Sequence, residues 1–171
     1  MFNLNDWISL PNLSTRRDEL SSVLGPDFNI YAIGGFGGDS QVLSSCEAYM
    51  LETESWEKIP SMLTARRALS AVSMSDGIYV MGGYDGSTYL KELERYDHRM
   101  KKWVSLAPMS HARCTLTACA DGQYIYAIGG FNGSPLNTVE RYSVFENKWE
   151  EVAPMKTERF MHCSVITNEF P

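Results

Sequence analysis

The sequence lacks a surplus of basic residues, and this limits the partners that it could bind. Its 171 residues include 15 Lys and Arg against 21 Asp and Glu, which gives a formal net charge of -6 at pH 7. Proteins that bind nucleic acids or anionic membranes usually carry a basic surplus. The composition therefore argues against both as general partners, while a local basic patch stays compatible with it.

Long hydrophobic runs are missing too, although 44% of the residues are hydrophobic. The first ten residues read MFNLNDWISL, with Asn5 and Asp6 where a signal peptide would be apolar and with no basic segment before them. No run approaches the length that crosses a membrane. A globular protein in the cytoplasm is the simplest expectation.

Residues that bind metals or perform catalysis are few and scattered. The four cysteines have no CxxC spacing, and two of them, Cys46 and Cys119, stand where other parts of the chain have Leu or Val, as buried structural thiols would. The adjacent His162 and Cys163 would point to opposite faces of a strand and could not both bind one metal ion. The sequence therefore predicts no catalytic residues, no metal site and no cofactor.

What the sequence does contain is an internal repeat of 46 to 48 residues. Each repeat holds a glycine pair, a tyrosine and, seven positions after the tyrosine, a tryptophan. The markers are Gly34, Gly35, Tyr49 and Trp56, then Gly82, Gly83, Tyr96 and Trp103, and then Gly129, Gly130, Tyr142 and Trp149. Trp7 stands at the tryptophan position of an incomplete unit before the first.

Alternating hydrophobicity and turn residues predict four short strands in each unit. In the central unit these strands are expected at about 67–73, 78–82, 90–96 and 102–106. Asp76-Gly77 and Asp85-Gly86 are suited to the tight turns between them. The recurring Tyr and Trp rings are expected to fill the core, and the fold class is all-β.

A period in the high forties with a glycine doublet and a Tyr…Trp pair resembles the kelch repeat, in which each unit is one four-stranded blade of a β-propeller. The resemblance covers almost the whole chain. It implies the last strand of a missing blade at 1–13, kelch repeats at 14–61, 62–108 and 109–155, and the start of a further blade at 156–171. The parent would be a six-bladed propeller, or a ring closed by two chains, and exposed blade faces should favour self-association.

Antiparallel topology gathers the loop before the first strand and the turn after the second strand of every unit at one end. This end is rich in aromatic and basic residues, and arginine forms charge-assisted hydrogen bonds with carboxylates and phosphates. The expected partner is therefore an acidic or phosphorylated segment of another protein. The candidate binding residues are Arg66, Arg113, Arg159, Phe36, Tyr84, Phe131, Ser87, Tyr89, Ser134, Asn137 and His111.

The recurring arginines also have a structural interpretation. Arg66, Arg113 and Arg159 each follow a methionine by four positions, and a glutamate recurs two positions before each marker tyrosine. An Arg–Glu pair between strands would explain both series by holding the blades together. The sequence leaves binding and structure open for these three residues.

By resemblance, the expected function is protein recognition without catalysis, as the substrate-recognition propeller of a cullin-RING ubiquitin ligase adaptor with an N-terminal BTB domain. An actin-binding or cytoskeletal scaffold is the alternative, and a BTB pattern upstream of Met1 would favour the adaptor. A copper oxidase built on similar blades is a distant third, because its convergent Tyr and His ligands cannot be assembled here.

Overall fold

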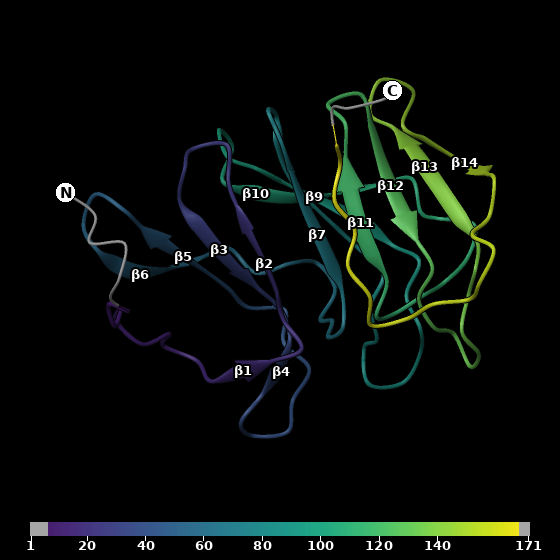
Figure 1. Cartoon of the computed structure of the whole chain (residues 1–171). Helices are drawn as coiled ribbons and strands as arrows, with labels where there is room; N and C mark the ends of the chain where they lie inside the picture. Colours follow the sequence, from purple (N-terminus) through teal and green to yellow (C-terminus); the bar gives the residue numbers. More distant parts are fainter. Residues whose placement is uncertain (1–6, 168–171) are drawn as a thin grey trace.

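The computed structural model describes residues 7–167, which form three four-stranded antiparallel sheets standing next to one another and one short two-stranded pair (Figure 1). The first sheet holds β2 (Ser21–Leu24), β3 (Ile30–Ile33), β5 (Cys46–Met50) and β6 (Ser55–Ile59). The second holds β7 (Ser70–Met74), β8 (Gly77–Met81), β9 (Leu93–Asp97) and β10 (Lys102–Leu106), and the third holds β11 (Thr117–Ala120), β12 (Tyr124–Ile128), β13 (Val139–Ser143) and β14 (Lys148–Val152). The pair consists of β1 (Arg17–Asp18) and β4 (Phe36–Gly37).

The all-β fold predicted from the sequence is confirmed, with one sheet for each repeat. The strands of each sheet follow chain order and are joined by hairpins. Over residues 7–167 there is no helix long and apolar enough to cross a membrane.

Two strands of the central unit begin later than expected, because the residues before them adopt loop conformations or make loop hydrogen bonds. β10 is the strand expected at 102–106, but β7 begins at Ser70 instead of 67, because Ala68 has a left-handed φ of 51° that no strand accommodates. β9 begins at Leu93 instead of 90, because the N–H of Leu90 donates to the Gly83 carbonyl.

The strands expected at the two chain ends are not formed by the described residues. Residues 7–13 include no strand and leave the Trp7 ring fully exposed, and 159–167 include none either. A fourth strand needs a third strand beside it, and a first strand needs a second, and no such neighbours occur among residues 7–167. Residues 1–6 and 168–171 of the predicted boundaries lie outside the described residues.

The hydrophobic core lies between neighbouring sheets. One cluster joins residues of the first and second units, and the other joins the second and third. Successive residues of β8 alternate between them, so Ile78 packs toward the first unit and Tyr79 toward the third. The buried thiol of Cys46 lies in the first cluster, where burial raises its pKa to about 12. It is a structural residue, as its place in the repeat predicts.

Each marker tryptophan links its own unit to the preceding one. Trp103 packs against Tyr96 with ring centroids 5.3 Å apart, and its indole N–H donates to the Pro60 carbonyl at 2.8 Å. Trp149 makes the same contact with the Ala107 carbonyl at 2.8 Å.

We expect Trp103→Ala to lower the free energy of unfolding by about 3–5 kcal/mol, the usual cost of removing a buried large aromatic ring. Trp7→Ala, the matched control at the same repeat position, should change it by less than about 0.5 kcal/mol because that ring is exposed. Urea unfolding followed by circular dichroism measures both. Equal effects of the two substitutions would contradict this account of the core.

The second glycine of each doublet is needed for a close backbone contact. Gly83 has a φ of 107°, and an added Cβ would lie 2.8 Å from the Arg67 carbonyl oxygen. Gly133 has a similar φ of 110°, but an added Cβ would meet nothing within 4 Å. Substitutions at these two positions therefore separate the cost of backbone strain from the cost of steric crowding.

Gly133→Ala should cost about 1–2 kcal/mol through its left-handed backbone alone. Gly83→Ala should cost at least about 1 kcal/mol more, because its methyl group also overlaps backbone. Thermal and urea unfolding of the two variants test the difference. If Gly133→Ala proved as costly as Gly83→Ala, crowding would not explain the doublet.

Candidate functional site

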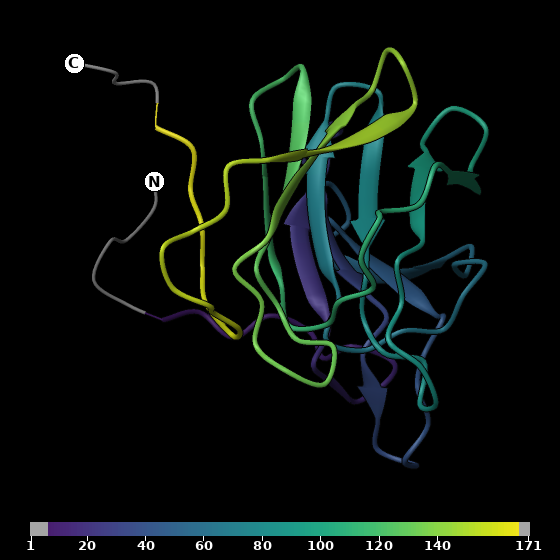
Figure 2. The same ribbon diagram turned by 90° about the vertical axis from the view of Figure 1, so that its right-hand side faces the viewer.

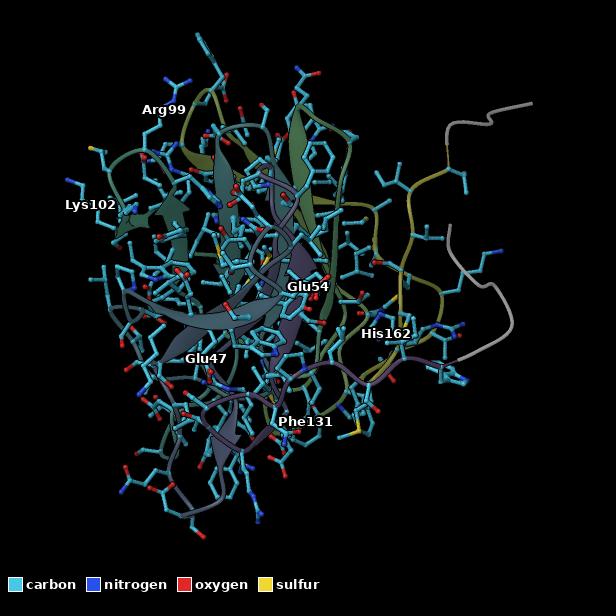
Figure 3. The ribbon with its side chains drawn as sticks, turned by 90° about the vertical axis from the view of Figure 1, so that its left-hand side faces the viewer. Glu47, Glu54, Arg99, Lys102, Phe131 and His162 are labelled. Atoms are coloured by element: carbon cyan, nitrogen blue, oxygen red, sulfur yellow. The ribbon has the colours of Figure 1, made fainter. Side chains whose placement is uncertain are left out.

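The loops before the first strands and the turns after the second strands meet at one end of the molecule, here called the loop end. In Figure 3 the labelled Phe131 lies at this end, at the bottom of the view, and Arg99 lies at the opposite end. Glycine doublets join the units here. The N–H groups of Gly35, Gly83 and Gly130 donate to the carbonyls of Arg66, Arg113 and Arg159 of the following segment, at 2.9, 2.9 and 2.7 Å.

Each buried arginine of the loop end is held by a glutamate of the third strand in its own unit. The Arg66 guanidinium donates to Glu94 Oε1 at 2.6 Å and to the carbonyls of Gly82 and Glu92. The Glu94 carboxylate also accepts the N–H groups of Leu63 and Thr64, at 2.7 and 3.0 Å. The carboxylate is thus enclosed by one guanidinium and two backbone donors, an arrangement here called the glutamate nest.

The nest occurs once in each of the three units. Arg17 pairs with Glu47 at 2.8 Å, and Arg113 pairs with Glu140 at 2.7 Å. Burial opposes ionisation of the Glu47 carboxyl, but the hydrogen bonds from the Ser14 N–H and from Arg17 outweigh it and lower its pKa. The carboxylate therefore stays charged at neutral pH.

The structure corrects the hypothesis that Arg66 and Arg113 bind a partner. Both side chains have 0% exposure, so neither reaches the surface. The structural interpretation fits them, with one change: each ion pair fixes the entry loop of one unit to the third strand of that same unit. The ion pairs do not join units; neighbouring units are linked by other contacts, among them the backbone hydrogen bonds of the glycine doublets. Arg159 is exposed and differs from the other two.

The innermost turns form a chain of backbone hydrogen bonds across the units. Glu19, Ala68, Thr115 and Met161 all have left-handed φ values, between 47° and 51°. The N–H groups of the last three donate to the carbonyl of the preceding member at 2.9, 2.8 and 2.9 Å. This chain fixes where the side chains around it are presented.

A band of aromatic side chains crosses the loop end beside these turns. The Arg67 guanidinium lies 5.1 Å from the Phe36 ring and 5.4 Å from the Tyr84 ring, within the range of cation–π contacts. The band continues from Tyr84 to Tyr89, Phe131 and Phe160, with successive ring centroids 5.3, 6.0 and 5.6 Å apart.

A cavity of about 730 Å³ opens between the aromatic band and the innermost turns. Its lining residues are Glu19, Leu20, Arg67, Ala68, Leu69, Tyr84, Tyr89, Cys114, Thr115, Leu116, Phe131, Phe160, Met161 and His162. The volume lies within the range of ligand-binding clefts, and an apolar wall with a few polar groups is typical of them.

The structure brings together only part of the predicted site. Tyr84, Tyr89 and Phe131 line the cavity, and Phe36 belongs to the band. Ser87 and Ser134 stand on exposed turns, and they do not line the cavity. The backbone carbonyl of Asn137 accepts a hydrogen bond from the Met155 N–H, and Asn137 does not line the cavity. The His111 ring faces Glu140 and Glu151, at 3.5 and 3.6 Å, instead of the cavity.

Several cavity residues were missed by the sequence reasoning. The two residues after each recurring arginine differ between units. They are Arg67-Ala68 after Arg66, Cys114-Thr115 after Arg113 and Phe160-Met161 after Arg159. Variation between units at a fixed repeat position is the sequence signal that could have found them. Their inward direction depends on the left-handed turn, which the sequence did not reveal.

Few charged groups line the cavity, and those present have opposite charges. Arg67 pairs with Glu19 at 3.1 Å, and both are partly exposed. Burial, followed by the nearby Arg159, lowers the pKa of His162, so the imidazole is neutral at pH 7. Burial raises the pKa of the Cys114 thiol, which keeps it protonated and unreactive. Across residues 7–167, no three His, Cys, Asp or Glu side chains are grouped to hold a metal ion.

Comparison with known proteins agrees with this geometry. The KLHDC2/KLHL20/DRC7 Kelch-repeats domain matches residues 7–170. This chain belongs to the kelch-repeat family. Its four-stranded sheets are kelch blades, and kelch domains generally bind other proteins.

Curated relatives match parts of the chain. Kelch domain-containing protein 8B of Rattus norvegicus is 34% identical over 87 residues, which cover 48% of this chain and 25% of that protein. Kelch-like protein 8 of Mus musculus is 35% identical over 65 residues, which cover 38% of this chain and 10% of that protein. The matched parts thus span a quarter or less of these relatives.

Arg113→Ala is expected to lower the free energy of unfolding by about 3–5 kcal/mol, because it leaves the buried Glu140 carboxylate without its counter-charge. Arg113→Ala combined with Glu140→Gln should recover part of this loss, since the unpaired charge is gone. Arg99→Ala, an exposed arginine at the opposite end, is the control and should be neutral. Urea unfolding measures these free energies. If the effects of the two substitutions were strictly additive, Arg113 and Glu140 would not be coupled as the nest requires.

Proposed function

We propose that this kelch chain is a non-catalytic protein-recognition module that binds a peptide segment of its partner in the cavity at the loop end. The observation that carries this proposal is the position of Tyr84, Tyr89 and Phe131, which project from two units into one cavity. Aromatic side chains in partly enclosed pockets supply much of the energy of protein interfaces. The rigid backbone beneath them holds the rings in place before binding.

An apolar or aromatic side chain of the partner is the anchor best suited to this cavity. The preference for an acidic or phosphorylated segment has less support, because Arg17, Arg66 and Arg113 are occupied by their own glutamates. Arg67 is the one arginine among the residues that line the cavity, and Glu19 already neutralises it. Any acidic group of the partner is therefore a secondary contact at the rim.

The wider role that we propose is recognition of substrates for a cullin-RING ubiquitin ligase in the cytoplasm. Support for it comes from the resemblance to kelch adaptors and from similarity to a protein named Kelch-like protein 8. A cytoskeletal scaffold is the alternative. Affinity capture from a cell lysate followed by mass spectrometry separates them, through recovery of ligase subunits or of actin.

Replacing Tyr89 and Phe131 together by alanine should weaken partner binding by at least tenfold, because both rings lose their contact with the anchor. Quantitative capture with the wild-type and variant chains measures the loss for each recovered protein. Circular dichroism must show an unchanged melting temperature, so that the loss reports on the cavity and not on folding.

Two substitutions provide matched controls. Ser134→Ala changes an exposed turn at the same end, and Lys102→Ala changes an exposed residue on β10 (Figure 3). Both should retain binding. Binding that survives loss of the two rings but fails with Lys102→Ala would place the site elsewhere on the molecule.

A further inference from the structure

The residue directly after each recurring arginine stands at what is here called the filler position. The three filler residues that follow a described unit are Arg67, Cys114 and Phe160. Arg67 and Cys114 each exchange two backbone hydrogen bonds with the aromatic residue after the glycine doublet of their own unit, Tyr84 and Phe131. The backbone therefore holds the filler position in the same way in both units.

Two of the three filler side chains cover an aromatic ring of the preceding unit. The Arg67 guanidinium lies 5.1 Å from the centroid of the Phe36 ring, and the centroids of the Phe160 and Phe131 rings are 5.6 Å apart. Residues 156–162, in yellow, bend at the lower side of Figure 2, where loops of the third unit, in green, also turn. A planar group at the filler position thus packs on the ring that the preceding unit presents.

Cys114 is too short to cover the equivalent ring. That ring belongs to Tyr84, and both residues line the cavity. Cys114 is 8% exposed, and burial raises the pKa of its thiol, so it stays protonated and packs as a small apolar side chain. The cavity therefore opens beside the filler position that lacks a planar group.

We propose that the partner supplies this planar group, as an aromatic side chain that stacks on Tyr84 beside Cys114. The Tyr89 ring centroid lies 5.3 Å from that of Tyr84 and 6.0 Å from that of Phe131, so three rings surround the space. Aromatic rings attract one another at such separations, in stacked or edge-to-face arrangements. This inference rests on the proposed function, and it narrows the anchor from any apolar group to an aromatic ring.

The residue that the preceding innermost turn presents explains why the anchor is aromatic and not cationic. Arg67 pairs with Glu19 of that turn at 3.1 Å. The equivalent residue for Phe160 is Thr115, which carries no charge, and in the cavity it is Ala68. A guanidinium beside Ala68 would lose water without gaining a counter-charge, whereas an aromatic ring would not.

The test uses the full chain and three probes that each carry one side chain, the N-acetyl amides of phenylalanine, leucine and arginine. Titration followed by two-dimensional amide NMR measures each affinity and identifies the backbone groups that respond. We expect the phenylalanine probe to bind at least about threefold more tightly than the others, because ring pairs attract beyond their buried area. It should shift the amide signals of Cys114 and Tyr84. A leucine or arginine probe that binds as tightly would overturn the aromatic assignment.

Cys114→Phe should fill the space from within, as Phe160 does at the next turn. Affinity for the phenylalanine probe should fall at least about tenfold, because two rings cannot share one close-packed space. Ser134→Phe is the matched control, since it adds the same ring on an exposed turn that does not line the cavity, and it should retain binding. Unchanged probe binding in a folded Cys114→Phe chain would place the ring elsewhere and overturn the proposal.

Arg67→Cys supplies the converse experiment and does not depend on the folding of Cys114→Phe. It uncovers the Phe36 ring and leaves the Glu19 carboxylate without its partner. The arginine probe should therefore gain binding, with a shift of the Phe36 amide signal that the wild-type chain does not show. No gain of binding by this probe would contradict the link between filler and turn residue.

Partner capture distinguishes failure of this inference from failure of the proposed function. If the double replacement of Tyr89 and Phe131 by alanine loses the captured partner but Cys114→Phe retains it, the cavity binds the partner and the aromatic filler is wrong. If both variants retain the partner while the probes behave as expected, the aromatic subsite stands and the proposed function is wrong. Melting temperatures measured by circular dichroism confirm that each variant is folded.

Discussion

The buried ion pair between an entry-loop arginine and a third-strand glutamate is the interaction on which the loop end depends. Its charges are fully removed from water, and such a pair is tolerated only when the remaining donors and acceptors are also matched. Here Arg66 uses two backbone carbonyls and Glu94 uses two backbone N–H groups, so the pair fixes the loop at several points. The backbone carbonyl of the arginine then accepts a hydrogen bond from the N–H of a glycine in the preceding unit.

This arrangement separates the backbone frame of the loop end from the side chains that the frame presents. The frame consists of buried pairs, glycine doublets and left-handed turns, and it is the same in every unit. The two residues after each arginine and the turns after the second strands differ between units and form the cavity wall. The side chains of the cavity wall can therefore be replaced without loss of the frame that carries them.

Neighbouring units also depend on one another for their cores. The clusters lie between sheets, and each marker tryptophan donates to a carbonyl of the preceding unit. A repeat of this kind buries its faces only when another unit stacks on it. Among the described residues, Arg159 and Val165 are exposed, whereas Arg113 and Val72 at the equivalent repeat positions are buried.

The sequence by itself determined the fold class, the repeat, the position of β10 and the end of the molecule where the loops gather. These follow from local alternation, turn residues and exact spacing, which act over a few residues. Only the tertiary structure decided that Arg66 and Arg113 are buried and that His111 turns away from the cavity. It also decided that the residues after the arginines face inward. The burial of the two arginines depends on partners about 30 residues away, Glu94 and Glu140. The direction of the side chains after the arginines depends on the left-handed turn, as at Ala68, and no residue type in the sequence predicts that turn.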